Sequence, residues 1–140
     1  MSGFLLDTNV VSELRNKQRC SPKVDAWAKT VPHNQQFLSV LVIGELARGA
    51  ALKRRTDPAT ADALEKWIAR LTALYDTRIF PVTLEVATTW GKLGAIRPIP
   101  PEDGLLAATA LVHGLTLVTR NVKHVDGLGV PLLNPWEELK

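Results

Sequence analysis

Short apolar runs alternate along the chain with longer segments in which apolar residues recur every three or four positions. Runs of the first kind are typical of buried strands, and segments of the second kind are typical of helices that bury one face. Five strands are predicted, at residues 4–6, 36–40, 78–82, 115–119 and 130–133. The run at 115–119 is uniformly apolar or β-branched, as a strand buried on both faces of a parallel sheet should be.

Six helices are predicted between these strands, at residues 8–15, 22–30, 41–53, 57–74, 83–95 and 101–113. Pro22, Pro58 and Pro101 stand in the first turns of three of them, where a missing backbone N–H costs nothing. Because strands and helices alternate from end to end, the pattern indicates one α/β domain over residues 1–140, built on a parallel sheet.

The helix predicted at 57–74 carries an apolar stripe at helical spacing. Its members are Leu64, Trp67, Ile68 and Leu71. A stripe of this kind is most simply core. It is also more apolar surface than one small sheet needs, so it predicts an interface with a second subunit or another protein.

Composition adds little that is specific. The hydrophobic content of 46% is ordinary for a globular domain, and the single cysteine excludes an internal disulfide. No apolar run is long enough to span a bilayer, so we expect a cytoplasmic protein. The net charge of +3 permits an anionic partner. Arg48, Lys53, Arg54 and Arg55 form a basic cluster that predicts either a solvated helix end or a contact with nucleic-acid phosphates.

Three acids stand at comparable places in this pattern. Asp7 ends the first strand, Glu45 lies on the helix after the second strand, and Asp103 begins the helix that leads into the fourth strand. Alone, Asp7 could simply cap a helix and Glu45 could be a partly exposed helix residue. In a parallel sheet, however, all three can meet beyond the carboxyl ends of the strands.

Carboxylates brought that close repel one another, so the cluster requires a cation. Oxygen ligands without a cysteine or a histidine pair indicate Mg²⁺, with Mn²⁺ as an alternative. A metal held by carboxylates most often serves phosphoryl chemistry, because it orients water and offsets charge that develops on phosphate.

The acids stand within five short motifs that follow one another in order. These are LLDTN at 5–9, IGELARG at 43–49, DGLLAATA at 103–110, LVTRN at 117–121 and LNPW at 133–136. In this order they resemble the signatures of the PIN domain, and in particular those of the VapC toxins and their FitB-like branch. The resemblance covers nearly the whole chain.

The resemblance implies a PIN-like α/β/α sandwich around a mainly parallel five-stranded sheet. It also implies a metal-dependent endoribonuclease, usually a homodimer, that is held inactive by a VapB-like antitoxin and can join that antitoxin on operator DNA. Carried over by position, Asp7, Glu45 and Asp103 match the metal-binding acids. Asn9 matches a polar residue that supports the first acid, and residues 119 and 121, a threonine and an asparagine, fall where the family closes its site.

The chain departs from many relatives in this last segment, where they carry a fourth acid. Asn121 and His124 stand at the two places where that acid is found, and Asp126 lies two residues further on. An amide can orient a ligand or a water but adds no charge. The sequence therefore leaves open whether Asn121, His124 or Asp126 completes the site.

Two other functions are alternatives to the ribonuclease. A haloacid-dehalogenase-type phosphatase needs a second aspartate two residues after the first, and Asn9 stands there instead. A PIN-like protein that only binds a regulatory partner would keep the fold without the reaction. Against this second alternative, three unused buried carboxylates would only reduce stability.

Overall fold

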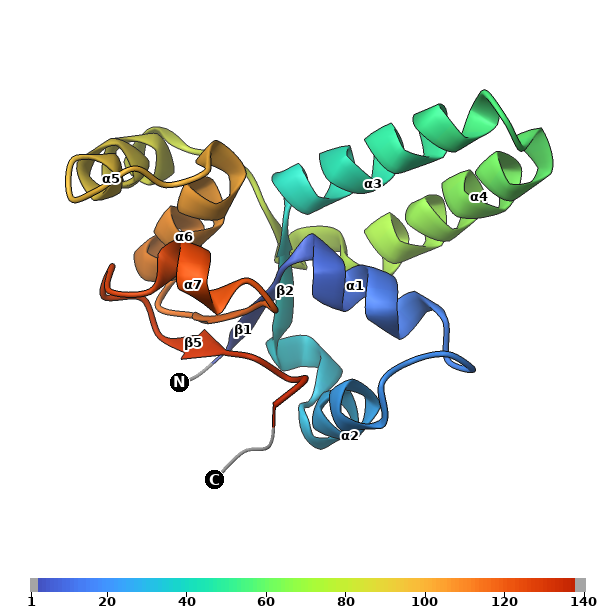
Figure 1. Cartoon of the computed structure of the whole chain (residues 1–140), viewed down its shortest axis with the longest axis horizontal. Coiled ribbons are helices and arrows are strands. Elements are labelled where there is room, and N and C mark those ends of the chain that lie inside the picture. Colours follow the sequence, from blue (N-terminus) through green and yellow to red (C-terminus); the bar gives the residue numbers. More distant parts are fainter. Residues whose placement is uncertain (1–2, 138–140) are drawn as a thin grey trace.

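The computed structural model describes residues 3–137, and its centre is a five-stranded sheet in which every pairing is parallel (Figure 1). The strand order is β3-β2-β1-β4-β5. The strands are β1 (Phe4–Leu6), β2 (Gln36–Ser39), β3 (Ile79–Phe80), β4 (Thr116–Val118) and β5 (Leu132–Leu133). All five predicted strands are confirmed, although four of them are shorter than predicted. The predicted α/β class is also confirmed.

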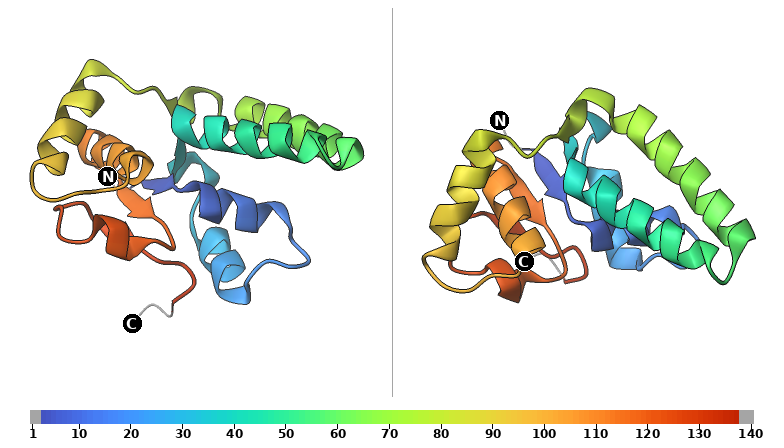
Figure 2. Two further views of the ribbon diagram at one scale, coloured as in Figure 1. Left: turned by 45° about the horizontal axis from the view of Figure 1, so that its top comes forward. Right: turned by 90° about the horizontal axis from the view of Figure 1, so that it is seen from above.

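Helices cover both faces of this sheet (Figure 2). Helices α5 and α6 lie on one side, and α1, α3 and α4 lie on the other. The helices are α1 (Thr8–Arg15), α2 (Pro22–Thr30), α3 (Val40–Arg54), α4 (Pro58–Tyr75), α5 (Leu84–Gly94), α6 (Pro101–His113) and α7 (Val122–Val125), with short 3-10 turns at His33–Gln35 and Asp76–Arg78. Helices α3 and α4 form an antiparallel pair that extends away from the sheet. In the described part of the chain, no helix is long and apolar enough to cross a membrane.

The core lies where the central strands meet the helices. Leu5, Leu6 and Leu117 of β1 and β4 are fully or almost fully buried, as are Leu106 of α6 and Val42 of α3. Strand β1 is therefore covered from both sides, which explains why its sequence is continuously apolar rather than alternating. Because β1 is the middle strand, Asp7, which follows it, lies at the centre of the carboxyl edge of the sheet.

The helix boundaries follow local signals in the sequence. Ser39 ends β2 and caps α3, because its Oγ accepts the Leu41 N–H at 3.1 Å. Gly114 ends α6 in a left-handed conformation with φ of 66°, which a glycine adopts at no steric cost. The prediction missed α7, whose four residues are too few to show a helical period.

Candidate metal centre at the carboxyl edge of the sheet

Asp7 stands at the junction of β1 and α1. Its backbone N–H still donates to Val118 of β4 at 2.9 Å, while its Oδ1 caps α1 by accepting the Thr8 N–H at 2.7 Å. Its other oxygen, Oδ2, accepts the Thr119 hydroxyl at 2.7 Å. The side chain is thus a helix cap and also a buried acid, since the residue is only 6% exposed.

The electrostatic surroundings of Asp7 oppose its ionisation. Burial raises the pKa of this carboxyl, and the nearby charges of Asp103 and Glu102 raise it further. The hydrogen bonds from Thr119 and Thr8 act in the opposite direction, because they stabilise the carboxylate. A group in this situation gains from a neighbouring cation.

The ends of β1 and β4 are tied together by the predicted supporting residues. Asn9 approaches Oδ2 of Asp7 with its Nδ2 at 3.5 Å, and its Oδ1 accepts the Arg120 N–H at 3.4 Å. The Asn121 N–H donates to Thr119 Oγ at 3.0 Å, so Asn121 acts on Asp7 through Thr119. The amide side chain of Asn121 itself belongs to an exposed residue at the start of α7.

Glu45 reaches the same edge from the second turn of α3. The pKa of this half-buried carboxyl is raised to about 7, first by burial and then by the charge of Glu102 and a hydrogen bond shared with it. Asp7 adds to the rise, whereas the Thr8 hydroxyl opposes it. Thr8 Oγ1 is nevertheless a buried oxygen that completes no hydrogen bond of normal geometry among residues 3–137.

Two neighbouring acids enter from the first turn of α6. Asp103 is the more buried, with 17% of its side chain exposed, and its Oδ2 lies 2.7 Å from Nδ1 of His124. Glu102 is exposed at its helix but interacts with Glu45, so it supplies a fourth carboxylate that the sequence interpretation missed. The only signal for it was its place beside Asp103, which the helix dipole explained equally well.

The donor chemistry at this edge fits a hard divalent cation. The charged ligand groups are carboxylates, and neighbouring acids raise the pKa of Asp7 and of Glu45. The buried Thr8 hydroxyl oxygen also has no partner of normal geometry within residues 3–137. The acids interact in pairs, however, and within residues 3–137 no three His, Cys, Asp or Glu side chains form a ready group of metal ligands. Binding would therefore require the carboxylates to turn toward a common ion.

The short helix α7 places His124 against the acids. The three residues that could complete the site make different contacts. The His124 side chain contacts Asp103, whereas Asn121 acts through its backbone N–H. Asp126 contributes only a backbone carbonyl, which accepts from Arg97 at 2.7 Å. Arg97 also donates to the carbonyl of His124 at 3.2 Å. It thereby caps the end of α7 and holds the imidazole at the edge of the site.

The predicted basic cluster is not one surface. Arg54 is bound by two acids of α4, at 2.8 Å to Asp62 and 3.0 Å to Glu65. Residues 53 to 55 stand at the far end of α3, about 13 Å along the helix from Glu45 at 1.5 Å per residue. Arg48 is exposed and lies within one turn of Glu45. A role of this cluster in binding RNA stays a prediction.

Comparison with known proteins decides the family. The sequence profile of the PIN domain matches residues 4–126. The chain belongs to the PIN domain family. It is 34% identical over 143 residues to the VapC ribonuclease Y4jK of Sinorhizobium fredii, covering 96% of this chain and 98% of that protein. It is 32% identical to Toxin FitB of Neisseria gonorrhoeae, covering 96% and 99% of the two chains.

Solved structures agree with this assignment. The chain matches a structure of FitAB bound to an IR36 DNA fragment with a TM-score of 0.88 and 28% identity, over 98% of each chain. The crystal structure of FitAcB from Neisseria gonorrhoeae gives the same TM-score at 30% identity, covering 96% and 99% of the two chains. The predicted PIN-like α/β/α fold is confirmed. Nucleases of this family are generally dependent on a divalent metal. Membership in the family also rules out the haloacid-dehalogenase alternative.

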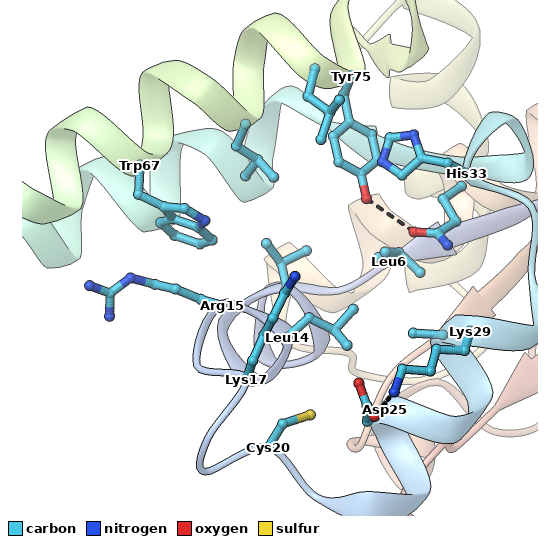
Figure 3. Close-up of a pocket in the computed structure, with 15 residues that line it drawn as sticks. Leu6, Leu14, Arg15, Lys17, Cys20, Asp25, Lys29, His33, Trp67 and Tyr75 are labelled. Carbon is cyan, nitrogen blue, oxygen red and sulfur yellow. Dashed lines mark hydrogen bonds and ion pairs between the residues drawn. The ribbon is translucent and has the colours of Figure 1, made fainter.

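A separate groove of about 570 Å³ lies between α1, α2 and α4 (Figure 3). Its apolar lining includes Leu14 of α1 and Trp67 and Leu71 of α4, and Lys17 and Lys29 stand beside them. The stripe predicted on α4 therefore serves both the core and this groove. None of the three predicted metal-binding acids lines the groove.

Proposed function

We propose that the protein is the ribonuclease toxin of a toxin–antitoxin pair and that it cleaves RNA phosphodiesters with Mg²⁺, or alternatively Mn²⁺. The observation that supports this most is the meeting of acids from β1, α3 and α6 at one edge of a PIN-domain sheet. The relatives named VapC ribonuclease and tRNA(fMet)-specific endonuclease VapC support the same reaction.

Asp7, Glu45 and Asp103 would hold the divalent ion, with Glu102 beside them. When bound, such an ion supplies activation of water and offsets charge on the phosphate. Thr119 keeps the Asp7 carboxylate in its orientation, and Asn121 fixes the Thr119 hydroxyl. Water is the expected nucleophile, so no covalent enzyme intermediate should form.

The proposed partner is a VapB-like antitoxin. Several neighbours in structure are toxin–antitoxin complexes, and some of these are bound to DNA. We infer that this chain likewise joins its antitoxin, works as a homodimer and assembles with the antitoxin on operator DNA. The groove beside α4 is the surface proposed for the antitoxin, because it offers an apolar lining with Lys17 beside it, whereas Lys29 is already paired with Asp25 at 2.8 Å.

Cleavage of bulk transfer RNA by the purified protein, with and without Mg²⁺, tests the reaction. Asp7→Ala should abolish cleavage, because the side chain removed is the most buried acid at the edge. Circular dichroism of the variant should show an intact fold. Expression of the wild-type chain alone should stop growth, and co-expression of the adjacent antitoxin gene should restore it. An Asp7→Ala variant as active as the parent would refute the proposed site.

Replacing Glu85 in the same way provides the matched control. Glu85 is an exposed acid in the first turn of α5, which lies on one face of the sheet. Glu85→Ala removes a carboxylate from a helix start and should leave cleavage unchanged.

A further inference from the structure

Three strands end side by side where the acids meet. Strand β4 lies between β1 and β5, and the Thr119 N–H donates to the Leu133 carbonyl at 3.0 Å. The residues that follow these strands must therefore be neighbours. They include Asp7 after β1, Arg120 after β4 and Trp136 after β5.

Arg120 and Trp136 form a stacked pair at this edge. The guanidinium carbon of Arg120 lies 4.9 Å from the centre of the Trp136 ring. The backbone of Arg120 is fixed from the other side, because its N–H donates to Asn9, which approaches Asp7. The cation is thus positioned by contacts to both of the neighbouring strand ends.

The turn that carries Trp136 is fixed by Asn134. The Asn134 side-chain Oδ1 accepts the backbone N–H of Trp136 at 2.9 Å. The backbone carbonyl of Asn134 accepts the Glu137 N–H at 3.1 Å. The indole also packs against the hydrophobic core. The ring is therefore held in place beneath the guanidinium, which it attracts through its π face.

The donors of Arg120 are unused within the described part of the chain. Stacking leaves the five N–H groups at the rim of the guanidinium, and its side chain forms no hydrogen bond or ion pair among residues 3–137. Three other arginines are engaged by the protein itself, since Arg97 and Arg78 bind backbone carbonyls and Arg54 binds two acids.

This arrangement has a consequence for the Arg120 guanidinium. Within residues 3–137 the Arg120 side chain contacts the Trp136 ring and pairs with none of the acids. The guanidinium therefore stays available for an external anion such as a phosphate. A guanidinium held this way can bind a phosphate through its free N–H groups.

We propose that Arg120, supported by Trp136, is a phosphate-binding subsite for the RNA strand next to the cleavage position. The proposal rests on the ribonuclease function proposed above. A polyanion that approaches an acidic centre is repelled, and a fixed cation beside that centre offsets the repulsion. Arg120 binds the backbone, so it sets the position of the strand rather than its sequence.

Filter binding of end-labelled bulk transfer RNA tests the subsite, with Asp7→Asn as the background that prevents cleavage. Adding Arg120→Ala should weaken binding about tenfold or more, as loss of a charged hydrogen bond does. It should also flatten the plot of log K against log salt by about 0.7 to 0.9, the contribution of one phosphate contact. Arg120→Lys should keep most of the slope and lose part of the affinity, because the charge remains and the flat fork is lost.

The chain offers a matched control in a second arginine–tryptophan pair. Arg15 lies over Trp67 at 5.5 Å, at the opposite end of α1 from Asp7. Arg15→Ala removes the same charge and the same kind of stacking and should leave the affinity and the salt slope within twofold of the background. If Arg120→Ala and Arg15→Ala change RNA affinity and salt slope equally, Arg120 acts only through its charge, and the proposed subsite is wrong.

Failure of the subsite and failure of the ribonuclease function have different outcomes. If the wild type cleaves transfer RNA but Arg120→Ala binds it with unchanged affinity and slope, the subsite is wrong and the function stands. If the wild type neither binds nor cleaves RNA, both proposals are wrong. Trp136→Phe keeps a ring under the guanidinium and should bind RNA better than Trp136→Ala at equal melting temperature, and the opposite order would also refute the stacked pair.

Discussion

Thr119 donates its hydroxyl hydrogen to Oδ2 of Asp7 over 2.7 Å, although 112 positions separate the two residues. Both side chains are almost fully buried. The contact exists because β1 and β4 are paired in register, so that residues following the two strands come together. A buried carboxylate that accepts such a bond keeps one orientation, which a metal ligand needs.

Replacing Thr119 by valine should therefore impair the site more than the fold. The variant leaves Oδ2 of Asp7 without its strongest partner, so the pKa of Asp7 should rise and divalent-ion affinity should fall about tenfold. Thr109→Val is the control, because Thr109 is equally buried in α6 but donates to the Leu105 carbonyl. Both variants should cost about 1 kcal/mol of unfolding free energy. Calorimetric titration with Mn²⁺ should separate them, and equal affinities would contradict the role of Thr119.

The sequence predicted the fold better than the site. A continuous apolar strand followed by Asp7 and a helix is a local pattern, and so is Asp103 in a helix start, so both could be placed without a structure. Glu102 could not be assigned, because its interaction with Glu45 joins α6 to α3 and depends on tertiary packing. The contact of His124 with Asp103 was missed for the same reason, and because α7 has no period to reveal it.

The pKa of Glu45, raised to about 7, predicts how stability varies with pH in the metal-free protein. Between about pH 4.5 and pH 7 the folded chain holds a proton that the unfolded chain has released. Stability should therefore fall as the pH rises through this range. Glu45→Gln should flatten the dependence, and melting curves from about pH 5 to pH 8 measure it.

Binding of a divalent metal ion should offset the loss of stability at higher pH. Protons compete with the ion for Glu45, so Mg²⁺ or Mn²⁺ should raise the melting temperature more at about pH 8 than at about pH 5. In Glu45→Gln the difference between the two pH values should shrink. An equal effect of metal at both pH values in the wild type would exclude Glu45 as a ligand.

The basic cluster should divide into active and inactive members. Arg48 is exposed near Glu45, so Arg48→Ala should weaken binding of transfer RNA and flatten its salt slope by about 0.7 to 0.9. Arg54 is occupied by Asp62 and Glu65, so Arg54→Ala should leave the slope unchanged and alter stability little, because surface ion pairs are screened by solvent. Neutralising Lys53, Arg54 and Arg55 together should weaken binding of transfer RNA. The loss should come from Lys53 and Arg55, because Arg54 is already paired. A larger effect from Arg54 than from Arg48 would mean that the tip of the α3–α4 pair contacts RNA.

Substitutions in the groove between α1, α2 and α4 should weaken binding of the antitoxin and leave the rate of RNA cleavage unchanged. Leu74 lines it and is 60% exposed, so Leu74→Glu should change stability little while placing a charge on an apolar docking surface. We expect cleavage of transfer RNA to remain at the wild-type rate and antitoxin affinity to fall about 30-fold, which corresponds to about 2 kcal/mol for a central contact.

Leu84→Glu is the control for this prediction. Leu84 is 85% exposed on α5, which lies on the other side of the sheet from the groove. That variant should remain fully neutralised in cells that co-express the antitoxin, whereas Leu74→Glu should still stop growth. If Leu74→Glu is neutralised as well as Leu84→Glu, the antitoxin binds elsewhere. The apolar stripe of α4 would then serve the core and the subunit interface.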